Sequence, residues 1–164
     1  MKKEALDFQL PLLLQIIDEA YAKKAWHGPN LKGSIRGLTA REAAWRPARR
    51  RHNIWEIVIH ATYWKYAIRR RLRGDKKGSF FYKGSNWFRA PVSLTEEAWK
   101  RDVGLLEQEH QKMREAIRRL VRPTKHQPRP VGSTSIVTLI YGVAFHDVYH
   151  AGQIQLLKRL QRRS

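Results

Sequence analysis

Hydrophobic residues recur at intervals of three and four positions in four long segments, a spacing that places them on one face of an α-helix. The pattern predicts long helices over about residues 4–24, 53–73, 93–122 and 133–162. Pro11 interrupts the first segment, so the regular part of that helix is expected to begin near it. No run of alternating β-branched residues is long enough to build a sheet. The fold class is therefore expected to be all-α.

Polar residues at the expected helix starts support these boundaries. Ser, Thr or Asn three residues before Glu is the spacing of a capping box, in which each side chain bonds the other residue's backbone N–H. At Thr39 and Glu42 this spacing predicts a short helix within a connector. The second and third long helices are expected to start with the same motif, in the pairs Asn53 with Glu56 and Ser93 with Glu96.

The second long helix is apolar on two sides. Ile54, Ile57 and Ala61 belong to one stripe, and Trp55 and Ile59 to the other. Such a helix has two neighbours, so it either lies at the centre of the fold or contributes to a dimer contact. Four long amphipathic helices in 164 residues predict a four-helix bundle, expected to form a single domain over residues 1–164.

The connection over residues 74–94 is rich in glycine and aromatic residues, among them Phe80, Phe81, Tyr82, Trp87 and Phe88. It is too long and too apolar to be a plain linker. Two interpretations are open: the segment lines a pocket, or it covers exposed core.

The chain is strongly basic, with 33 Lys and Arg against 14 Asp and Glu and a net charge of +19. This balance favours an anionic partner, either nucleic acid, an anionic membrane surface or an acidic small molecule. The absence of cysteine excludes thiol nucleophiles and thiolate metal sites. No apolar stretch approaches the roughly 20 residues that cross a bilayer, so a soluble, cytoplasmic protein is expected.

Three histidines stand out on the expected helices. His146 and His150 are four residues apart on the apolar stripe of the last helix, so their imidazoles can converge on one ion. His60, on the second long helix, would complete a three-nitrogen set with an open position for water or substrate. Nickel, zinc, iron or manganese suits imidazole ligands. The alternative is that these are core histidines, each satisfied by one hydrogen bond.

Other polar residues are weaker candidates for chemistry. Glu56 is one helical turn before His60 and could orient an imidazole or act as a general base, or it could serve only the capping box with Asn53. His110 interrupts the apolar stripe of the third long helix, where it could approach an ion or pack in the core. Tyr149, together with Asp147 and Gln153, could support the histidine pair.

Several segments of the chain resemble the DinB-like superfamily of four-helix proteins, which includes the YfiT-like proteins and bacillithiol transferases. The segment HDVYHAGQI, residues 146–154, is similar to the part that holds the second and third metal histidines of that family. NIWEIVIH, residues 53–60, is similar to the part that holds the first. WHGP at residues 26–29 and WRP at residues 45–47 resemble one branch of these proteins.

The resemblance implies an up-down-down-up bundle with long crossover connections and a divalent metal, most often nickel or zinc, held by His60, His146 and His150. It also implies a homodimer, and an enzyme that transfers low-molecular-weight thiols or hydrolyses a small acidic substrate.

Two alternatives stay open. The basic clusters at residues 69–73, 118–119 and 158–163 could bind nucleic acid, although no known recognition motif is present. The protein could instead be a noncatalytic dimer in which the metal is structural.

Overall fold

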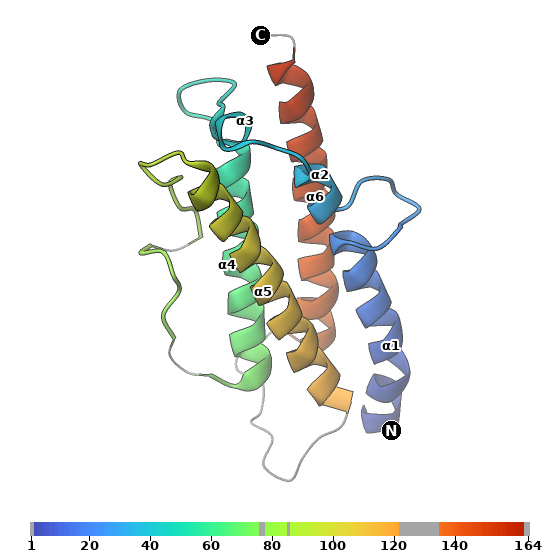
Figure 1. Ribbon diagram of the computed structural model, residues 1–164. Coiled ribbons are helices and arrows are strands. Elements are labelled where there is room, and N and C mark those ends of the chain that lie inside the picture. The colour runs from blue at the N-terminus through green and yellow to red at the C-terminus, as the bar shows by residue number, and fades with distance from the viewer. Residues whose placement is uncertain (1, 76–77, 85, 122–134, 163–164) are drawn as a thin grey trace.

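The computed structural model describes residues 2–75, 78–84, 86–121 and 135–162, and these form helices and no strand. Figure 1 shows four long helices and, in the connection between the first two, a pair of short ones. Their bounds are α1 Lys2–Tyr21, α2 Leu31–Ile35, α3 Ala40–Ala44, α4 Ile54–Arg73, α5 Glu96–Val121 and α6 Ile136–Gln161. The prediction of an all-α protein is confirmed for the described residues.

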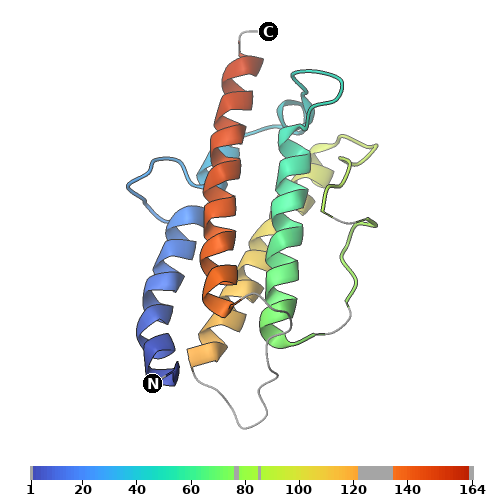
Figure 2. The ribbon, with the colours of Figure 1, turned by 180° about the vertical axis from the view of Figure 1, so that it is seen from behind.

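The long helices lie side by side in a bundle. Followed along the chain in Figure 1, α1 and α6 run upward, and α4 and α5 run downward. Because α4 and α5 point the same way, the chain must return between them, and Figure 2 shows residues 78–84 and 86–95 running back along the bundle. α4 contacts both α5 and α6, and α1 packs against α6 and α5. The connection between α1 and α4 crosses the upper end with α2 and α3.

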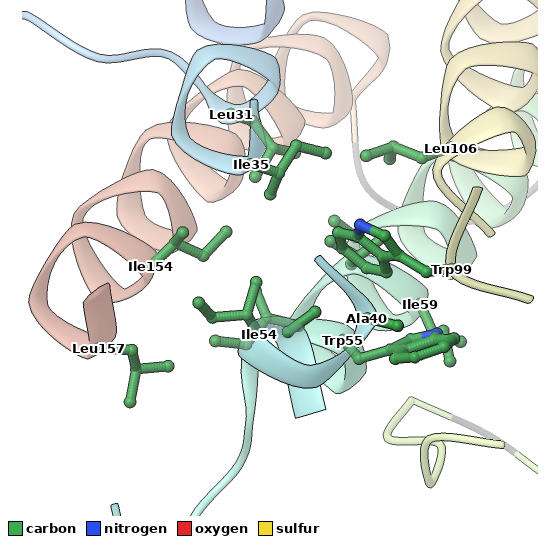
Figure 3. Close-up of a cluster of buried hydrophobic side chains, with 14 of the residues drawn as sticks. Leu31, Ile35, Ala40, Ile54, Trp55, Ile59, Trp99, Leu106, Ile154 and Leu157 are labelled. Atoms are coloured by element: carbon green, nitrogen blue, oxygen red, sulfur yellow. The ribbon is translucent and has the colours of Figure 1, made fainter. Parts of the chain in front are cut away.

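Helix α4 is the central helix, which explains its two apolar sides. Trp55 and Ile59 are fully buried within this one chain, and the Trp55 indole donates a hydrogen bond to Asp102 of α5 at 2.7 Å. The second stripe therefore packs on α5 and leaves no free surface for a partner. Figure 3 shows the resulting core, to which each helix from α2 to α6 contributes side chains.

The helix starts confirm some of the predicted caps. Thr39 and Glu42 form the complete capping box of α3, and the Asn53 side chain caps α4 by accepting from the Glu56 N–H at 2.8 Å. The carboxylate of Glu56 does not complete that box, because it binds Arg46 and His52 instead.

Two predicted boundaries were wrong. The box of Ser93 with Glu96 is not formed: the Thr95 hydroxyl caps α5 through the Ala98 N–H, and Glu96 accepts from the Ala40 N–H of α3 at 2.7 Å. α1 begins at Lys2, so Pro11 lies inside the helix, where it costs one backbone hydrogen bond but does not end the helix.

Further boundaries lie partly outside the described residues. Helix α6 is capped by Ser135, whose hydroxyl accepts from Thr138 N–H at 3.1 Å. The expected start near residue 133, the end near residue 122 and the proline-rich connection between them fall outside the described residues. Among the described helices, none is both long enough and apolar enough to span a membrane.

Candidate metal centre

Three imidazoles from two helices converge at one point of the bundle. His60 of α4 and His146 and His150 of α6 form a group whose facing nitrogens lie within 4.8 Å of one another. The Nε2 atom of His146 is 3.0 Å from Nε2 of His60 and 3.0 Å from Nε2 of His150. Nitrogen ligands about 2.1 Å from a common metal ion are themselves about 3 Å apart when the angle at the metal is close to 90°. This spacing therefore fits a shared ion.

Hydrogen bonds on the far side of two rings fix which nitrogen faces the group. His60 Nδ1–H donates to the backbone carbonyl of Asn86 at 2.7 Å, and a carbonyl can only accept. His150 Nδ1 is 2.7 Å from the amide oxygen of Gln153, whose NH₂ in turn donates to the Tyr149 hydroxyl at 2.9 Å. Neutral rings in this state turn the Nε2 lone pairs of His60 and His150 toward His146.

The electrostatic environment keeps these rings neutral. Burial lowers the pKa of His146 to about 3, assisted by the other two histidines and by Lys65. Burial also lowers the pKa of His150, to about 4, and the pKa of His60. Unprotonated nitrogens this close repel one another unless something positive lies between them. Nδ1 of His146 is also buried without a hydrogen-bond partner among the described residues. The donor set and its protonation state thus fit a divalent cation.

The loop between α4 and α5 builds one wall of the group. Asn86 adopts a left-handed backbone conformation, with φ of 64°, which asparagine tolerates better than most residues. Its side-chain oxygen accepts from the Trp64 indole N–H at 3.0 Å, while its carbonyl meets His60. The next residue, Trp87, stacks on His60 with ring centroids 3.9 Å apart. The loop covers core, since Phe80 and Phe88 pack around Tyr63. It also contributes Arg89 to the lining of a surface pocket.

Glu56 binds Arg46 and His52, and not His60 as its position in the sequence allowed. Its buried carboxylate accepts from the Arg46 guanidinium through both oxygens, and from His52 at 2.9 Å. Burial alone would raise the pKa of Glu56, but the bonds from Arg46 and His52 lower it below its usual value. Both oxygens are occupied by these bonds, so Glu56 orients His52 and Arg46.

His110 and Tyr149 differ in their relation to the three histidines. His110 is not part of the group: it is buried on α5 and stacks on Tyr21 of α1 at 3.7 Å. Tyr149 is 62% exposed, its ring lies 5.1 Å from that of His150, and its hydroxyl accepts from Gln153. Tyr149 and Gln153 therefore support His150, whereas His110 packs in the core.

Asp147, also a candidate from the sequence, bonds Lys65 and is not part of the histidine group. It forms a fully buried ion pair with Lys65 of α4, and the Lys65 ammonium lies 4.9 Å from the centre of the Tyr21 ring. Burial raises the pKa of Asp147, and Lys65 opposes that shift. This pair links α4 to α6 one residue from His146, and the charge of Lys65 contributes to the lowered pKa of His146 and of His150.

The sequence did not indicate that Asn86 and Trp87 would contact His60, or that His52 would stack on Trp87. Trp87 and Asn86 are more than 25 positions from His60 in the chain, so no spacing rule connects them to it. The only signal was the unusual density of aromatic residues in the 74–94 segment.

Comparison with known proteins agrees with this arrangement. A family model described as the DinB superfamily matches residues 25–154, which include all three histidines. Searches of curated proteins and of solved structures found no significant match.

Proposed function

The chain belongs to the DinB superfamily, and we propose that it is a metal-dependent enzyme. In this proposal His60, His146 and His150 bind one divalent ion. Nickel and zinc are the first candidates, and iron and manganese are the alternatives. The observation that supports this most directly is that Nε2 of His146 lies 3.0 Å from Nε2 of both His60 and His150, while acceptors hold the Nδ1–H groups of His60 and His150. A divalent ion bound there would act as a Lewis acid toward a substrate or a thiol.

An open coordination position favours catalysis over a structural metal. A structural site is closed by a fourth protein ligand, whereas a catalytic site keeps three and leaves the next position to water or substrate. Within the described ranges, no fourth His, Asp or Glu joins the group. His146 is itself only partly buried, so a small molecule could approach the group from the solvent.

The proposed reaction is transfer of a low-molecular-weight thiol to a small acidic electrophile, with hydrolysis of such a substrate as the alternative. In the transfer, the thiolate sulfur forms a bond to carbon, the leaving group departs with its electron pair, and the thiol proton passes to solvent. Asn86 and Gln153 would hold the imidazole rings of His60 and His150, and Trp87 would exclude water from its side of the histidine group. The net charge of +19 would attract the acidic substrate.

Elemental analysis of protein purified without a histidine tag tests the metal site. We expect about one metal ion per chain in the parent and none in a variant carrying His146→Ala and His150→Ala that keeps its helical circular dichroism. An unchanged metal content in that variant, or no metal in the parent after incubation with nickel, zinc and manganese, would refute the proposal.

Activity is tested with a small thiol and 1-chloro-2,4-dinitrobenzene, and with a 4-nitrophenyl ester, each at matched metal occupancy. Turnover of either substrate that disappears in the double histidine variant supports an enzyme. Full metal occupancy without turnover of any thiol acceptor or ester would favour a structural metal.

We also propose that the protein is a homodimer, joined through α6. Five large apolar side chains on that helix are exposed, at intervals of four and seven residues: Tyr141, Phe145, Tyr149, Leu156 and Leu160. Leu156→Glu is expected to give a monomer in sedimentation velocity. Val92→Glu, in the loop before α5, is the matched control and should sediment like the parent. A monomeric parent would refute the dimer.

The nucleic-acid alternative rests on charge alone. Binding that disappears near physiological salt would confirm that only charge is involved.

A further inference from the structure

An arginine-lined pocket lies next to His52, the histidine that stacks on Trp87. Five arginines surround a surface pocket of about 390 Å³: Arg46, Arg49, Arg50, Arg51 and Arg89. Its remaining walls are His52 and the carboxylate of Glu56. The volume is within the range of sites that hold small molecules or part of one.

The charges in this pocket are not balanced by the protein. Arg46 is paired with Glu56, but Arg49, Arg50, Arg51 and Arg89 have no acidic partner in the part of the chain that the structure describes. Four unpaired guanidinium groups around one hollow repel one another, and an anion between them would relieve that repulsion. Guanidinium groups bind carboxylate and phosphate through paired hydrogen bonds, which makes these two groups the matching ligands.

One side of the pocket is rigid. The Arg46 guanidinium donates to both oxygens of the buried Glu56 carboxylate and to the backbone carbonyl of Arg51. His52 is fixed by its bond to Glu56 at 2.9 Å and by stacking on Trp87 with ring centroids 3.8 Å apart. These contacts hold the segment that carries Arg49 and Arg50 against the loop that carries Arg89.

Trp87 lies between His52, which lines the pocket, and His60 of the histidine group. Trp87 stacks on His52 at 3.8 Å and on His60 at 3.9 Å, within 8° of parallel in both cases. Two parallel rings at these distances cannot occupy the same face of an indole, so His52 and His60 lie on opposite faces. A molecule with its charged end among the arginines therefore needs to extend only past the edge of Trp87 to reach the histidine nitrogens.

We propose that this arginine pocket binds the anionic group, carboxylate or phosphate, of the small molecule on which the enzyme acts. The inference rests on the proposed function, since it specifies where the acidic substrate is held. A pocket formed by two loops, with Glu56 as one wall, favours a compact anion over an extended phosphate backbone. Nucleic acid is therefore treated as an outcome of the test.

The test measures binding of inorganic phosphate and of succinate by isothermal titration calorimetry at constant ionic strength. All measurements use the His146→Ala, His150→Ala background, so that a bound metal cannot contribute the binding. The pocket variant carries Arg49→Gln, Arg51→Gln and Arg89→Gln. The control variant carries Arg71→Gln, Arg118→Gln and Arg159→Gln, which removes the same charge from exposed positions on α4, α5 and α6.

We expect the pocket variant to bind the preferred anion at least about tenfold more weakly, and the control variant to change the affinity less than about twofold. Stronger binding of phosphate or of succinate identifies which anion the pocket prefers. Equal losses in both variants, or no binding of either anion at about 10 mM, would overturn the inference. Displacement of the anion by an oligonucleotide at physiological salt would also overturn it, because the surface would then be a nucleic-acid site.

The metal content of the pocket variant is also measured with the three histidines intact. This measurement distinguishes a failure of the pocket proposal from a failure of the metal-site proposal. Loss of anion binding with full metal occupancy supports the pocket as an independent site. Anion binding in protein that never takes up metal would refute the proposed metal enzyme while leaving the pocket intact.

Discussion

The indole of Trp87 lies flat on the imidazole of His60, with ring centroids 3.9 Å apart and ring planes 6° from parallel. His60 is thus held on three sides: by the indole face, by the Asn86 carbonyl at Nδ1 and by the α4 backbone. An imidazole restrained in this way loses little conformational freedom when a metal binds at Nε2.

Trp87→Ala is expected to weaken metal binding about tenfold, because His60 gains freedom and water reaches the site. Trp87→Phe keeps a stacked ring and should retain most of the affinity. Metal affinity is measured by competition with a chelator of known strength. Phe81→Ala, an exposed aromatic of the same loop, is the control, and an equal loss there would indicate a general effect on the loop.

Gln153→Leu is expected to weaken metal binding by about 10- to 100-fold, because His150 Nδ1–H loses its acceptor and the ring loses its orientation. Gln153→Glu keeps an acceptor oxygen and should bind metal at least as well as the parent. The same chelator competition distinguishes them. If both variants lose affinity equally, the hydrogen bond is not the cause. Gln111→Leu, on α5, controls for loss of a surface amide.

The predicted part of the site has a clear origin in the sequence. His146 and His150 could be placed together because four residues on a helix fix their relative position, whatever the rest of the fold does. The partnership of His150 with Gln153 follows from the same local geometry, and the structure bears it out. His60 needed more, since its approach to α6 depends on how two helices far apart in the chain pack. The sequence offered His60 as a histidine that could complete the set, and the family resemblance pointed to the same residue.

The remainder depends on tertiary contacts that have no local pattern. The capping-box spacing at Glu56 was real, yet Arg46 and His52 bind the carboxylate more strongly than one backbone N–H would. At the start of α5, Glu96 was assigned to Ser93 but reaches α3 instead. In each case the sequence identified a carboxylate that could accept a hydrogen bond, and the fold determined which donor was in reach.

Lys65→Met is expected to lower the free energy of unfolding by about 3–5 kcal/mol, because it leaves the Asp147 carboxylate buried and unpaired. The variant with both Lys65→Met and Asp147→Leu should lose much less, since no isolated charge remains in the core. Urea unfolding of both single variants and the double variant measures the coupling. Additive losses would show that the two side chains contribute independently.

His110 makes the folded protein sensitive to acid. Burial, with the charge of Lys65, lowers its pKa to about 3, whereas an unfolded histidine has a pKa of about 6.5. The unfolded chain therefore takes up a proton first as the pH falls, and the stabilisation present above pH 6.5 is lost progressively toward pH 3.

His110→Phe, which keeps a ring against Tyr21, is expected to reduce the loss of stability between pH 7 and pH 5 by about 2 kcal/mol. Urea unfolding of metal-free protein at both pH values measures the difference. An unchanged pH dependence would show that folding does not lower the pKa of His110. His27→Phe, in an exposed connector, is the control and should leave the pH dependence unchanged.

The two tryptophans beside the histidine group give the protein a built-in optical sensor. Trp87 stacks on His60, and Trp64 lies with its ring centre 6.1 Å from that of His146. An ion with a partly filled d shell, such as nickel, would quench the fluorescence of both indoles at this range, whereas zinc, with its filled d shell, would leave the emission largely intact. A titration without any added dye would then report how much of the protein is loaded, and which of the two metals it carries.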